Sequence, residues 1–495
     1  MVRYHRRMRD DEIRQKLVSS NPWWAAASLG KDATAWSTRH PALKGLASYD
    51  VGYRAPVLDD VATGPVTDRL VVLTGPRRIG KSVAVLQTVA SLCARDDIDP
   101  RQVIHVPCDG MNLRDLRRVL VVARAQTAAI DRDELRLRVW LFDEITSIRG
   151  WSALFKGERD NTDFGFDTVV VTGSRWDKTE DITGNLIAGR SGSETRRRRM
   201  LLPMSFREFL GVSRYDLPQP AAGHPASLQS QEARRSLEEL SFLVDDYDLA
   251  WQDYMSVGGF PRAVSEHIRN GLVSDQYLQD LEGWLQRDVD PDAGEESIPL
   301  LLEALATRAT SPLAVNPTAI ELGRSREALD TRLHRMVASF AVLRCPQRDD
   351  HGRLVPRTQS KHYLVDPLLA WMPSRLRAGA LPPAMTALTE QTIGVHLARA
   401  IERLGNGRWI AGDTIGYGRT SNDKEIDLTP VSLPSPDGTV MSVALESKWV
   451  SQGWRGEGRI LTGKYGRGIL ATKSVLDVSG PVWAVPAPML ALMLV

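Results

Sequence analysis

The 495-residue sequence has few of the features that mark secreted or membrane proteins. It contains only three cysteines, Cys93, Cys108 and Cys345, at spacings that match neither a disulfide framework nor a metal site. No run of about 18 apolar residues is present, so no membrane-spanning helix is expected. The basic N-terminus is not followed by the apolar stretch of a secretory signal. We therefore expect that the three thiols are buried and reduced, and that the protein is cytoplasmic and does not associate with a membrane.

The chain also lacks a large net charge. Its 63 Lys and Arg residues and 61 Asp and Glu residues give a formal net charge of +2, so any basic surface for nucleic acid must be local. Hydrophobic residues make up 42% of the chain and charged residues 25%, which is ordinary for globular domains. At about 150 residues per domain, the length allows roughly three domains.

The most specific motif follows the apolar run 70–73. Residues 75–82 read GPRRIGKS, and a helical pattern begins directly after them. A strand, a glycine-rich loop and a helix in this order are the context of a P-loop, whose backbone N–H groups and helix N-terminus face phosphate oxygens. The motif therefore predicts ATP binding, against the alternative of a plain glycine-rich turn. The residues expected to bind the nucleotide are Gly75, Pro76, Arg77, Arg78, Ile79, Gly80, Lys81, Ser82 and Val83.

Two side chains of this loop have specific chemical roles in the interpretation. Lys81 would reach the β- and γ-phosphates, and the Ser82 hydroxyl would be a ligand of Mg²⁺. ATP and Mg²⁺ are therefore the expected cofactors.

From residue 66 onward, short apolar runs alternate with helical segments. Strands are expected over 70–74, 103–107, 137–142 and 168–172, and helices over 83–94, 113–128 and 151–159. This alternation predicts an α/β domain with a parallel sheet. Near-continuous apolar strands such as 139–142 are typical of strands that are covered on both faces.

Polar residues at the ends of two of these strands complete a candidate catalytic set. Asp143 would hold the Mg²⁺-bound water and Glu144 would activate the attacking water, unless the pair is only a strand-end turn. Ser174 would sit beside the γ-phosphate, or belong to a simple Gly-Ser turn. Arg190 would contact the γ-phosphate from the same subunit or a neighbouring one, or be a solvated charge. The expected catalytic residues are thus Lys81, Glu144, Ser174 and Arg190.

Two further segments have less specific signals. Residues 1–65 are interpreted as an N-terminal arm. This arm is expected to pack onto the ATPase body through Trp23, Trp24 and Trp36. The alternative is that Trp24 is exposed and stacks on a nucleic-acid base. The run Arg196–Arg199 either contacts a phosphate backbone or keeps a loop soluble.

Several motifs recur in the order of a known family. They are LFDEI (141–145), VTGS (171–174), AGR (188–190), LPMSFREFL (202–210), YMSVGGFPRAV (254–264) and KHYLVDPLLAWM (361–372). From about residue 66 to 450 the chain resembles prokaryotic AAA-type ATPases with a winged-helix region and a C-terminal restriction-nuclease-like domain of formerly unknown function. The resemblance implies an additional strand between the P-loop strand and the acidic strand. After the arm it implies an ATPase core (66–215), a helical lid region (216–295), a winged-helix-like domain (296–375) and a nuclease-like α/β domain (376–495).

The winged helix implied by the resemblance has weak independent support. A short helix and turn over 317–324 precede an amphipathic helix over 325–337 that starts with a serine cap. On this second helix Arg326, Arg332 and Arg335 would face DNA, as on a recognition helix. Many such domains bind protein instead, so a protein partner is the alternative.

The C-terminal region contains the D…E-x-K pattern of restriction-type nucleases. Asp427 and Glu446 would ligate Mg²⁺, Lys448 would stabilise charge or position water, and Glu390 on the preceding helix would complete the site. Glu446 follows an expected strand over 441–445 and lies two residues before Lys448, on one strand face. The alternative is an ordinary charged strand edge.

These assignments lead to three hypotheses of function. The leading one is a Mg²⁺-dependent ATPase that couples hydrolysis to conformational change and to nucleic-acid engagement by its C-terminal half. The second is an ATP-gated DNA nuclease of a defence or mobile-element system. The third is a nucleotide-dependent switch that binds a protein partner. Oligomerisation is compatible with each of them.

Overall fold

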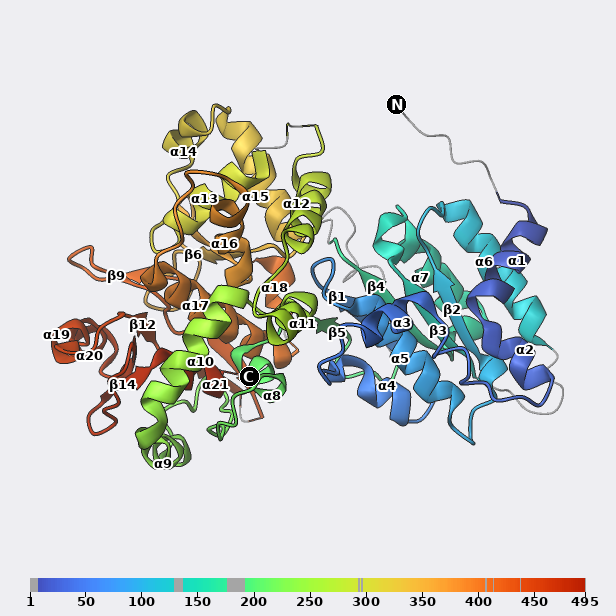
Figure 1. The fold of residues 1–495 in the computed structure, drawn as a ribbon, viewed down its shortest axis with the longest axis horizontal. Coiled ribbons are helices and arrows are strands. Elements are labelled where there is room, and N and C mark those ends of the chain that lie inside the picture. Colours follow the sequence, from blue (N-terminus) through green and yellow to red (C-terminus); the bar gives the residue numbers. More distant parts are fainter. Residues whose placement is uncertain are drawn as a thin grey trace. The chain divides into compact units, whose positions relative to one another are not determined.

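The computed structural model describes residues 8–128, 137–175, 192–292, 294, 297–405, 407–412, 414–436 and 438–494. The chain divides into two compact units, Met1–Leu201 and Leu202–Val495 (Figure 1). Each unit has its own sheets and helices.

The first unit is built on a five-stranded parallel sheet in the order β2-β3-β4-β1-β5. Its strands are β1 (Leu70–Thr74), β2 (Val103–Pro107), β3 (Val139–Asp143), β4 (Thr168–Gly173) and β5 (Arg198–Met200). Strands β1 and β4 are buried along their whole length, as expected for parallel strands covered on both faces. The predicted α/β core is confirmed, and β4 lies between the P-loop strand β1 and the acidic strand β3.

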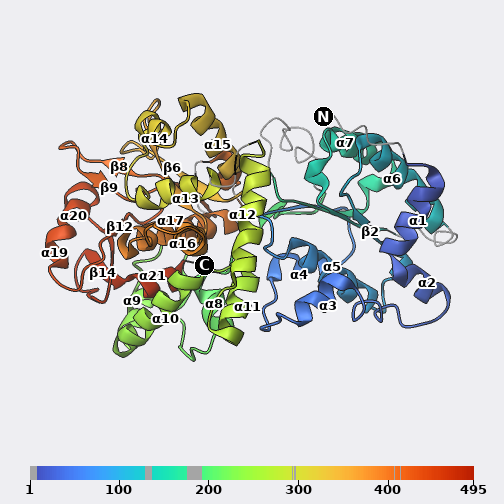
Figure 2. The same ribbon diagram turned by 45° about the horizontal axis from the view of Figure 1, so that its top comes forward.

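Helices cover both faces of this sheet. Figure 2 shows α4 and α5 on one side of it and α6 and α7 on the other. The side chain of Asn112 caps α6 by accepting hydrogen bonds from two N–H groups of its first turn. The helices of this unit are α1 (Asp10–Ser20), α2 (Pro22–Ser28), α3 (Pro41–Ala47), α4 (Asp59–Thr63), α5 (Lys81–Cys93), α6 (Leu113–Thr127) and α7 (Trp151–Asn161).

The N-terminal arm is joined to strand β2. The indole N–H groups of Trp23 and Trp24 both donate to the carbonyl of Val103, at 2.9 Å each. Asn21 is fully buried, and its amide donates to the carbonyl of His105 (2.9 Å) and accepts from the N–H of His105 (2.7 Å). The arm therefore satisfies backbone groups of an edge strand, and Trp24 is not exposed for base stacking.

Replacing Asn21 with Ala is expected to lower the free energy of unfolding of the first unit by about 2–4 kcal/mol, because it leaves two buried backbone groups of β2 without partners. Denaturant titration followed by tryptophan fluorescence measures the change. Asn161→Ala is the matched control, since that exposed side chain donates only to the carbonyl of Gly157. Equal stability of the two variants would contradict the role of Asn21.

The arginine run ends in a buried ion-pair network. Arg199 is 4% exposed, and its Nη2 lies 2.8 Å from Asp60 Oδ2 and 3.1 Å from Glu194 Oε2. Arg69 Nη2 lies 2.7 Å from the same Glu194 oxygen. Although burial opposes it, hydrogen bonds and charge from Arg199 and Arg69 lower the pKa of Asp60 to about 2. Both predicted roles, phosphate contact and loop solubility, are therefore wrong for Arg199, whose ion pair with Asp60 joins β5 to α4.

The second unit is organised around helix α17, in which every residue from Ala387 to Ile401 is buried. This helix packs against α13, α16, α21, β7 and β12. Residues 202–215, predicted to end the ATPase core, lie in this unit, where Phe206 packs edge-on against Trp251. No helix in the described ranges combines the length and apolar character needed to cross a bilayer.

The helices of the second unit are α8 (Phe206–Val212), α9 (Gln231–Glu239), α10 (Val244–Val257), α11 (Pro261–Asn270), α12 (Asp275–Val289), α13 (Ser297–Thr307), α14 (Val315–Glu321), α15 (Arg326–Ala338), α16 (Pro367–Leu376), α17 (Met385–Arg403), α18 (Arg408–Ala411), α19 (Trp454–Glu457), α20 (Arg459–Tyr465) and α21 (Ala487–Met493). Its strands are β6 (Val342–Pro346), β7 (Ser360–Leu364), β8 (Gly418–Arg419), β9 (Glu425–Ile426), β10 (Ser432–Ser435), β11 (Gly438–Met441), β12 (Leu445–Ser447), β13 (Gly468–Thr472) and β14 (Val482–Pro486). Strands β6 and β7 form an antiparallel hairpin after α14 and α15, and β12, β13 and β14 form a parallel sheet.

Two of the later sequence motifs meet in this unit. The N–H of Gly259 donates to Asp366 Oδ2 at 2.7 Å, and Leu368 N–H donates to Oδ1 at 2.9 Å. At Gly258, whose φ is 73°, a Cβ would lie 2.0 Å from Asp366 Oδ1, so the turn requires glycine there. The GG turn after α10 and the aspartate before α16 thus form one structural junction.

Candidate functional site

The loop between β1 and α5 is held tightly against the neighbouring strand. A Cβ on Gly75, whose φ is 154°, would lie 1.9 Å from the carbonyl oxygen of Leu201. Gly80 and Arg78 both adopt left-handed backbone conformations, with φ of 96° and 63°. Gly75 and Gly80, the first and sixth residues of GPRRIGKS, therefore allow the backbone conformation in which a loop can curl around a phosphate.

Lys81 lies inside this loop. Its side chain is buried, and its Nζ donates to the carbonyls of Gly75 (3.0 Å) and Pro76 (2.7 Å). Ser82 follows at the first turn of α5 with an exposed side chain, whereas the side chain of Ile79 is buried and offers only its backbone. An ammonium group held across the loop by two carbonyls is positioned for a phosphate that the loop encloses.

The two carboxylates after β3 are each hydrogen-bonded to the end of β4. Thr172 Oγ1 donates to Asp143 Oδ1 at 2.6 Å and accepts from the N–H of Glu144 at 2.9 Å. The N–H of Ser174 donates to Glu144 Oε1 at 3.2 Å, and the Ser174 hydroxyl also donates to this oxygen. Glu144 has a φ of 57°, which turns the chain sharply at the strand end.

The order of strands explains why these groups share one edge. Strands β3, β4 and β1 are neighbours and parallel, so their carboxyl ends lie together. Asp143, Glu144 and Ser174 therefore lie at the same edge of the sheet as the P-loop, which is where open α/β sheets bind ligands. Arg190 lies outside the described residues.

Two residues of this edge are absent from the predicted set. Burial, and then the charges of Glu144 and Asp143, raise the pKa of Asp109, while Arg77 opposes the shift. Burial lowers the pKa of His105 on β2, where Asp143 opposes the shift. The position of Asp109 just after β2 was the available signal, but a single acid after a short strand is not specific, and His105 in the middle of β2 gave no such signal.

The C-terminal residues of the D…E-x-K pattern also come together. The N–H of Asp427 donates to Glu446 Oε2 at 3.0 Å, and Lys448 Nζ lies 2.9 Å from Glu446 Oε1. Residues 428 and 445 pair in an isolated antiparallel bridge, which brings Asp427, just after β9, beside Glu446 of β12. The predicted strand 441–445 is wrong, because β11 ends at 441 and β12 begins at 445.

Lys361 of β7 joins this group, although no sequence pattern assigned it to the site. We define the C-terminal carboxylate cluster as Glu390, Glu425, Asp427 and Glu446. The fully buried Lys361 Nζ lies 2.7 Å from Glu390, 2.7 Å from Glu425 and 2.9 Å from Asp427. Burial raises the pKa of Glu390 to about 8 and that of Glu446 to about 7, and the charge of Asp427 adds to both shifts.

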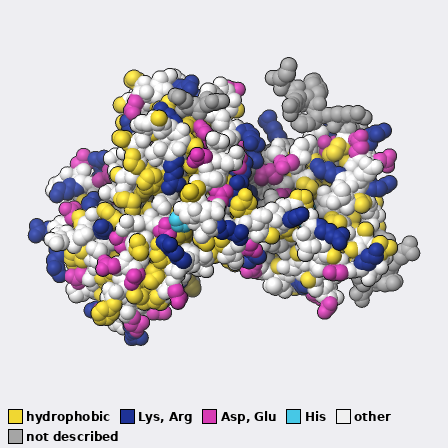
Figure 3. All heavy atoms as spheres, in the orientation of Figure 1, with side chains coloured by type: hydrophobic (Ala, Val, Ile, Leu, Met, Phe, Trp, Pro, Cys, Tyr) yellow, Lys and Arg dark blue, Asp and Glu magenta, His cyan; other side chains and the backbone are white. Residues whose placement is uncertain are grey.

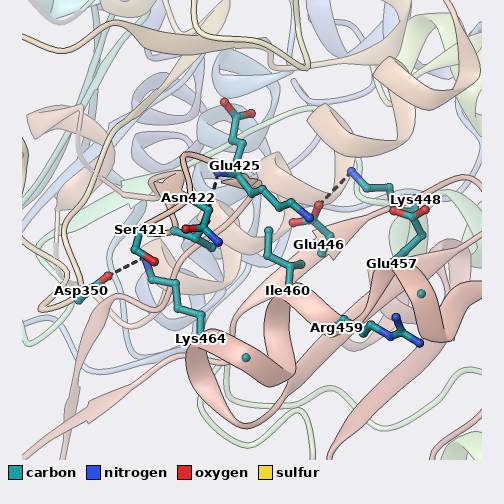
Figure 4. A pocket seen from close by; sticks show the side chains of 14 residues that line it. Asp350, Ser421, Asn422, Glu425, Glu446, Lys448, Glu457, Arg459, Ile460 and Lys464 are labelled. Atoms are coloured by element: carbon teal, nitrogen blue, oxygen red, sulfur yellow. Dashed lines mark hydrogen bonds and ion pairs between the residues drawn. The ribbon is translucent and has the colours of Figure 1, made fainter.

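An open hollow of about 760 Å³ lies beside Glu425 and Glu446 (Figure 4). Its lining mixes both signs of charge, and Figure 4 shows Lys448 paired with Glu446 and Lys464 paired with Asp350. The cations that line the hollow are Lys424, Lys448, Arg459 and Lys464.

Two of the three arginines on the predicted recognition helix α15 are not presented as expected, whereas Arg326 is exposed and lies 3.6 Å from Asp330. Arg332 is paired with Asp290, at 2.6 Å from Nε and 2.8 Å from Nη2, and Arg335 donates to the carbonyl of Val289 at 3.0 Å. Both side chains are turned toward the end of α12, which corrects the interpretation that they face DNA. On the face of the second unit visible in Figure 3, basic and acidic side chains are interspersed.

One family model matches most of the first unit and another matches part of the second. Residues 67–210 match a family model described as an AAA domain, and residues 248–378 match one described as "Domain of unknown function (DUF8612)". An uncharacterized protein of Haemophilus influenzae is 23% identical over 310 residues, which is 61% of this chain and 68% of the relative. The AAA match and the P-loop geometry identify a P-loop AAA-type ATPase domain.

Likeness to solved structures is more distant. The Walker-type ATPase PABY2304 of Pyrococcus abyssi is 14% identical, with a TM-score of 0.35, over 62% of this chain and 91% of that one. The ORC1 protein of Aeropyrum pernix, solved in complex with DNA, is 11% identical, with a TM-score of 0.29, over 68% of this chain and 89% of that one. Neither likeness is close enough to support a functional assignment.

Proposed function

We propose that the first unit binds ATP with Mg²⁺ and hydrolyses it. The observation that supports this best is the convergence of the P-loop with Asp143, Glu144 and Ser174 at one edge of the sheet. A phosphate-binding loop alone supports binding, whereas a carboxylate pair beside it supplies the groups that hydrolysis needs.

Each residue has a distinct task in this proposal. Lys81 would leave its two carbonyl partners in the loop and bind the β- and γ-phosphates. Ser82 and Asp143 would hold Mg²⁺, since an exposed hydroxyl and a carboxylate at the strand end are oxygen ligands that suit this ion. Bound Mg²⁺ would neutralise the charge that develops on the phosphates.

Glu144 is proposed to orient and deprotonate the attacking water. Its carboxylate is engaged by the N–H and hydroxyl of Ser174, so the productive state requires Glu144 to exchange this contact for the water. The released Ser174 hydroxyl would then donate to the γ-phosphate. This exchange would report the presence of the γ-phosphate to strand β4, and we propose it as the origin of conformational coupling.

The direct test is ATP turnover by the purified full chain, with Mg²⁺ and with excess chelator. We expect phosphate release that depends on Mg²⁺. Turnover that is absent under all conditions, while ATP still binds, would restrict the first unit to a nucleotide-binding role.

Ser174→Ala is expected to lower the rate of ATP turnover by about 10-fold to 100-fold, because one hydrogen bond to the γ-phosphate is lost. Steady-state phosphate release with wild type and variant measures the effect. Ser91→Ala, an exposed position on α5, is the matched control and is expected to match wild type. Wild-type turnover by the Ser174→Ala variant would show that Ser174 has no role in ATP hydrolysis.

We also propose that the second unit engages nucleic acid. The support is the hollow of the second unit, where Lys424 and Arg459 lie among acidic side chains, since Arg332 and Arg335 of α15 are engaged by partners within the unit. Binding of a fluorescent DNA or RNA oligonucleotide should weaken as salt rises, because phosphate contacts release counterions. Added nucleic acid should also change ATP turnover. Absence of binding at low salt would favour the nucleotide-dependent switch with a protein partner.

The ATP-gated nuclease is the remaining alternative. It requires plasmid cleavage with Mg²⁺ or Mn²⁺ that depends on ATP and is lost in Asp427→Ala. This alternative is favoured by the contacts that bring together Asp427, Glu446 and Lys448. It is opposed by Lys361, because the Lys361 Nζ lies 2.9 Å from an oxygen of Asp427 that a metal would need.

A further inference from the structure

The C-terminal carboxylate cluster already contains a buried cation. The Lys361 side chain has no solvent exposure, and its Nζ lies within 2.7–2.9 Å of oxygens from Glu390, Glu425 and Asp427. An ammonium group has three N–H donors, so these three carboxylates satisfy it completely. The carboxylates come from α17 and from the β9 segment, whereas the lysine comes from β7.

The oxygens that a metal would need are occupied by donors of the chain. Asp427 Oδ1 contacts Lys361 Nζ, and Oδ2 accepts the N–H of Ser447 at 2.9 Å. Glu446 Oε2 accepts the N–H of Asp427 at 3.0 Å, and Oε1 contacts Lys448 Nζ at 2.9 Å. All four oxygens of the two predicted metal ligands are therefore engaged.

These residues do not fit the divalent metal that the D…E-x-K pattern predicts. Mg²⁺ needs a near-octahedral set of oxygens at about 2.0–2.1 Å, several of them free of other partners. Among the described residues, no group of three or more His, Cys, Asp or Glu side chains is arranged to hold a metal ion. A divalent ion beside the Lys361 ammonium would also be repelled at short range in a buried setting.

We propose that the Lys361 ammonium group is the permanent cation of this cluster and prevents Mg²⁺ and Mn²⁺ from binding there. The lysine takes the central position between the carboxylates and joins β7 to α17 and β9. The cluster is then a structural junction of the second unit, and the chain does not hydrolyse nucleic acid there. The proposal is independent of ATP hydrolysis in the first unit.

The test is Mn²⁺ binding to the full chain without nucleotide, measured from the electron paramagnetic resonance signal of free Mn²⁺. Wild type and Asp427→Asn should bind equal amounts, because any ion held elsewhere on the chain is common to both. Lys361→Met should bind one further Mn²⁺ per chain, because the carboxylates lose their internal cation. The double variant Lys361→Met/Asp427→Asn should lose that additional ion.

Two results of the Mn²⁺ binding measurement would overturn the proposal. One is a Mn²⁺ ion that wild type binds and Asp427→Asn does not, and the other is folded Lys361→Met without any gain. Circular dichroism checks that each variant is folded. If Lys361→Met does not fold, the comparison of wild type with Asp427→Asn still decides whether the cluster holds a metal. Metal-dependent plasmid cleavage by wild type that Asp427→Asn lacks would also contradict it.

Discussion

Lys81→Ala is expected to lower ATP turnover at least about 10²–10³-fold, because the charge that faces the β- and γ-phosphates is removed. The buried Nζ is held by the carbonyls of Gly75 and Pro76, and Lys81 is the one lysine in the sequence of residues 75–82, so no second ammonium group of the loop can replace it. ATP affinity is expected to fall as well, since the lysine contacts the ground-state phosphates too. Phosphate release and fluorescent-nucleotide binding measure the two effects separately.

Glu144→Gln distinguishes catalysis from binding. It keeps the size of the side chain and a carbonyl oxygen for Ser174, but it cannot take a proton from water. Turnover is expected to fall by about 10²–10⁴-fold while ATP binding is retained. Lys44→Ala, which removes an exposed lysine of α3, is the matched control for Lys81→Ala and is expected to keep wild-type turnover. Similar turnover by wild type, Lys81→Ala and Glu144→Gln would show that the site is misassigned.

The second large effect is on stability. Lys361→Met is expected to destabilise the second unit by about 3–5 kcal/mol, because removing one partner of a buried ion pair leaves uncompensated charge. Here three acidic side chains lose their common partner, and protonation of Glu390, whose pKa burial already raises to about 8, limits the cost. Thermal and denaturant unfolding of wild type and variant measure the difference.

Two control substitutions make this measurement specific. Lys424→Met removes an exposed lysine nearby and is expected to change stability by less than about 0.5 kcal/mol. Glu425→Gln leaves Lys361 with Glu390 and Asp427, so its cost should be intermediate. If Lys361→Met were as stable as Lys424→Met, the cluster would not be held together by the buried lysine.

The sequence was most informative where the determinants are contiguous. The strand Leu70–Thr74, the P-loop and the start of α5 all lie within residues 70–83, and each is specified by short-range chemistry. The buried strands β2 and β4 were predicted closely for the same reason, since near-continuous apolar runs have few alternatives. The roles of Lys81, Glu144 and Ser174 stay predictions, although the structure places them at one edge.

The errors share a different origin. Arg332 was interpreted as a cation that faces DNA, and Arg199 as either a phosphate contact or a charge that keeps a loop soluble, but each is paired with an acid that is distant in the sequence. A local sequence pattern shows that a side chain is charged, but it does not show which acid or base that side chain pairs with in the folded chain. For the same reason the sequence did not indicate Asp109, because the groups that raise its pKa, Glu144 and Asp143, lie at the end of the neighbouring strand.

The sequence by itself determined the P-loop, the parallel α/β core and the acidic pair after β3, because those features are encoded by adjacent residues. Only the tertiary structure decided that the N-terminal arm covers β2 and that Lys361 enters a cluster which the D…E-x-K pattern assigns to a metal. The physical reason is that Lys361 and its three carboxylates come from separate elements. Their meeting depends on how β7, α17 and β9 pack, and burial then makes the ion pairs between them strong enough to define the site.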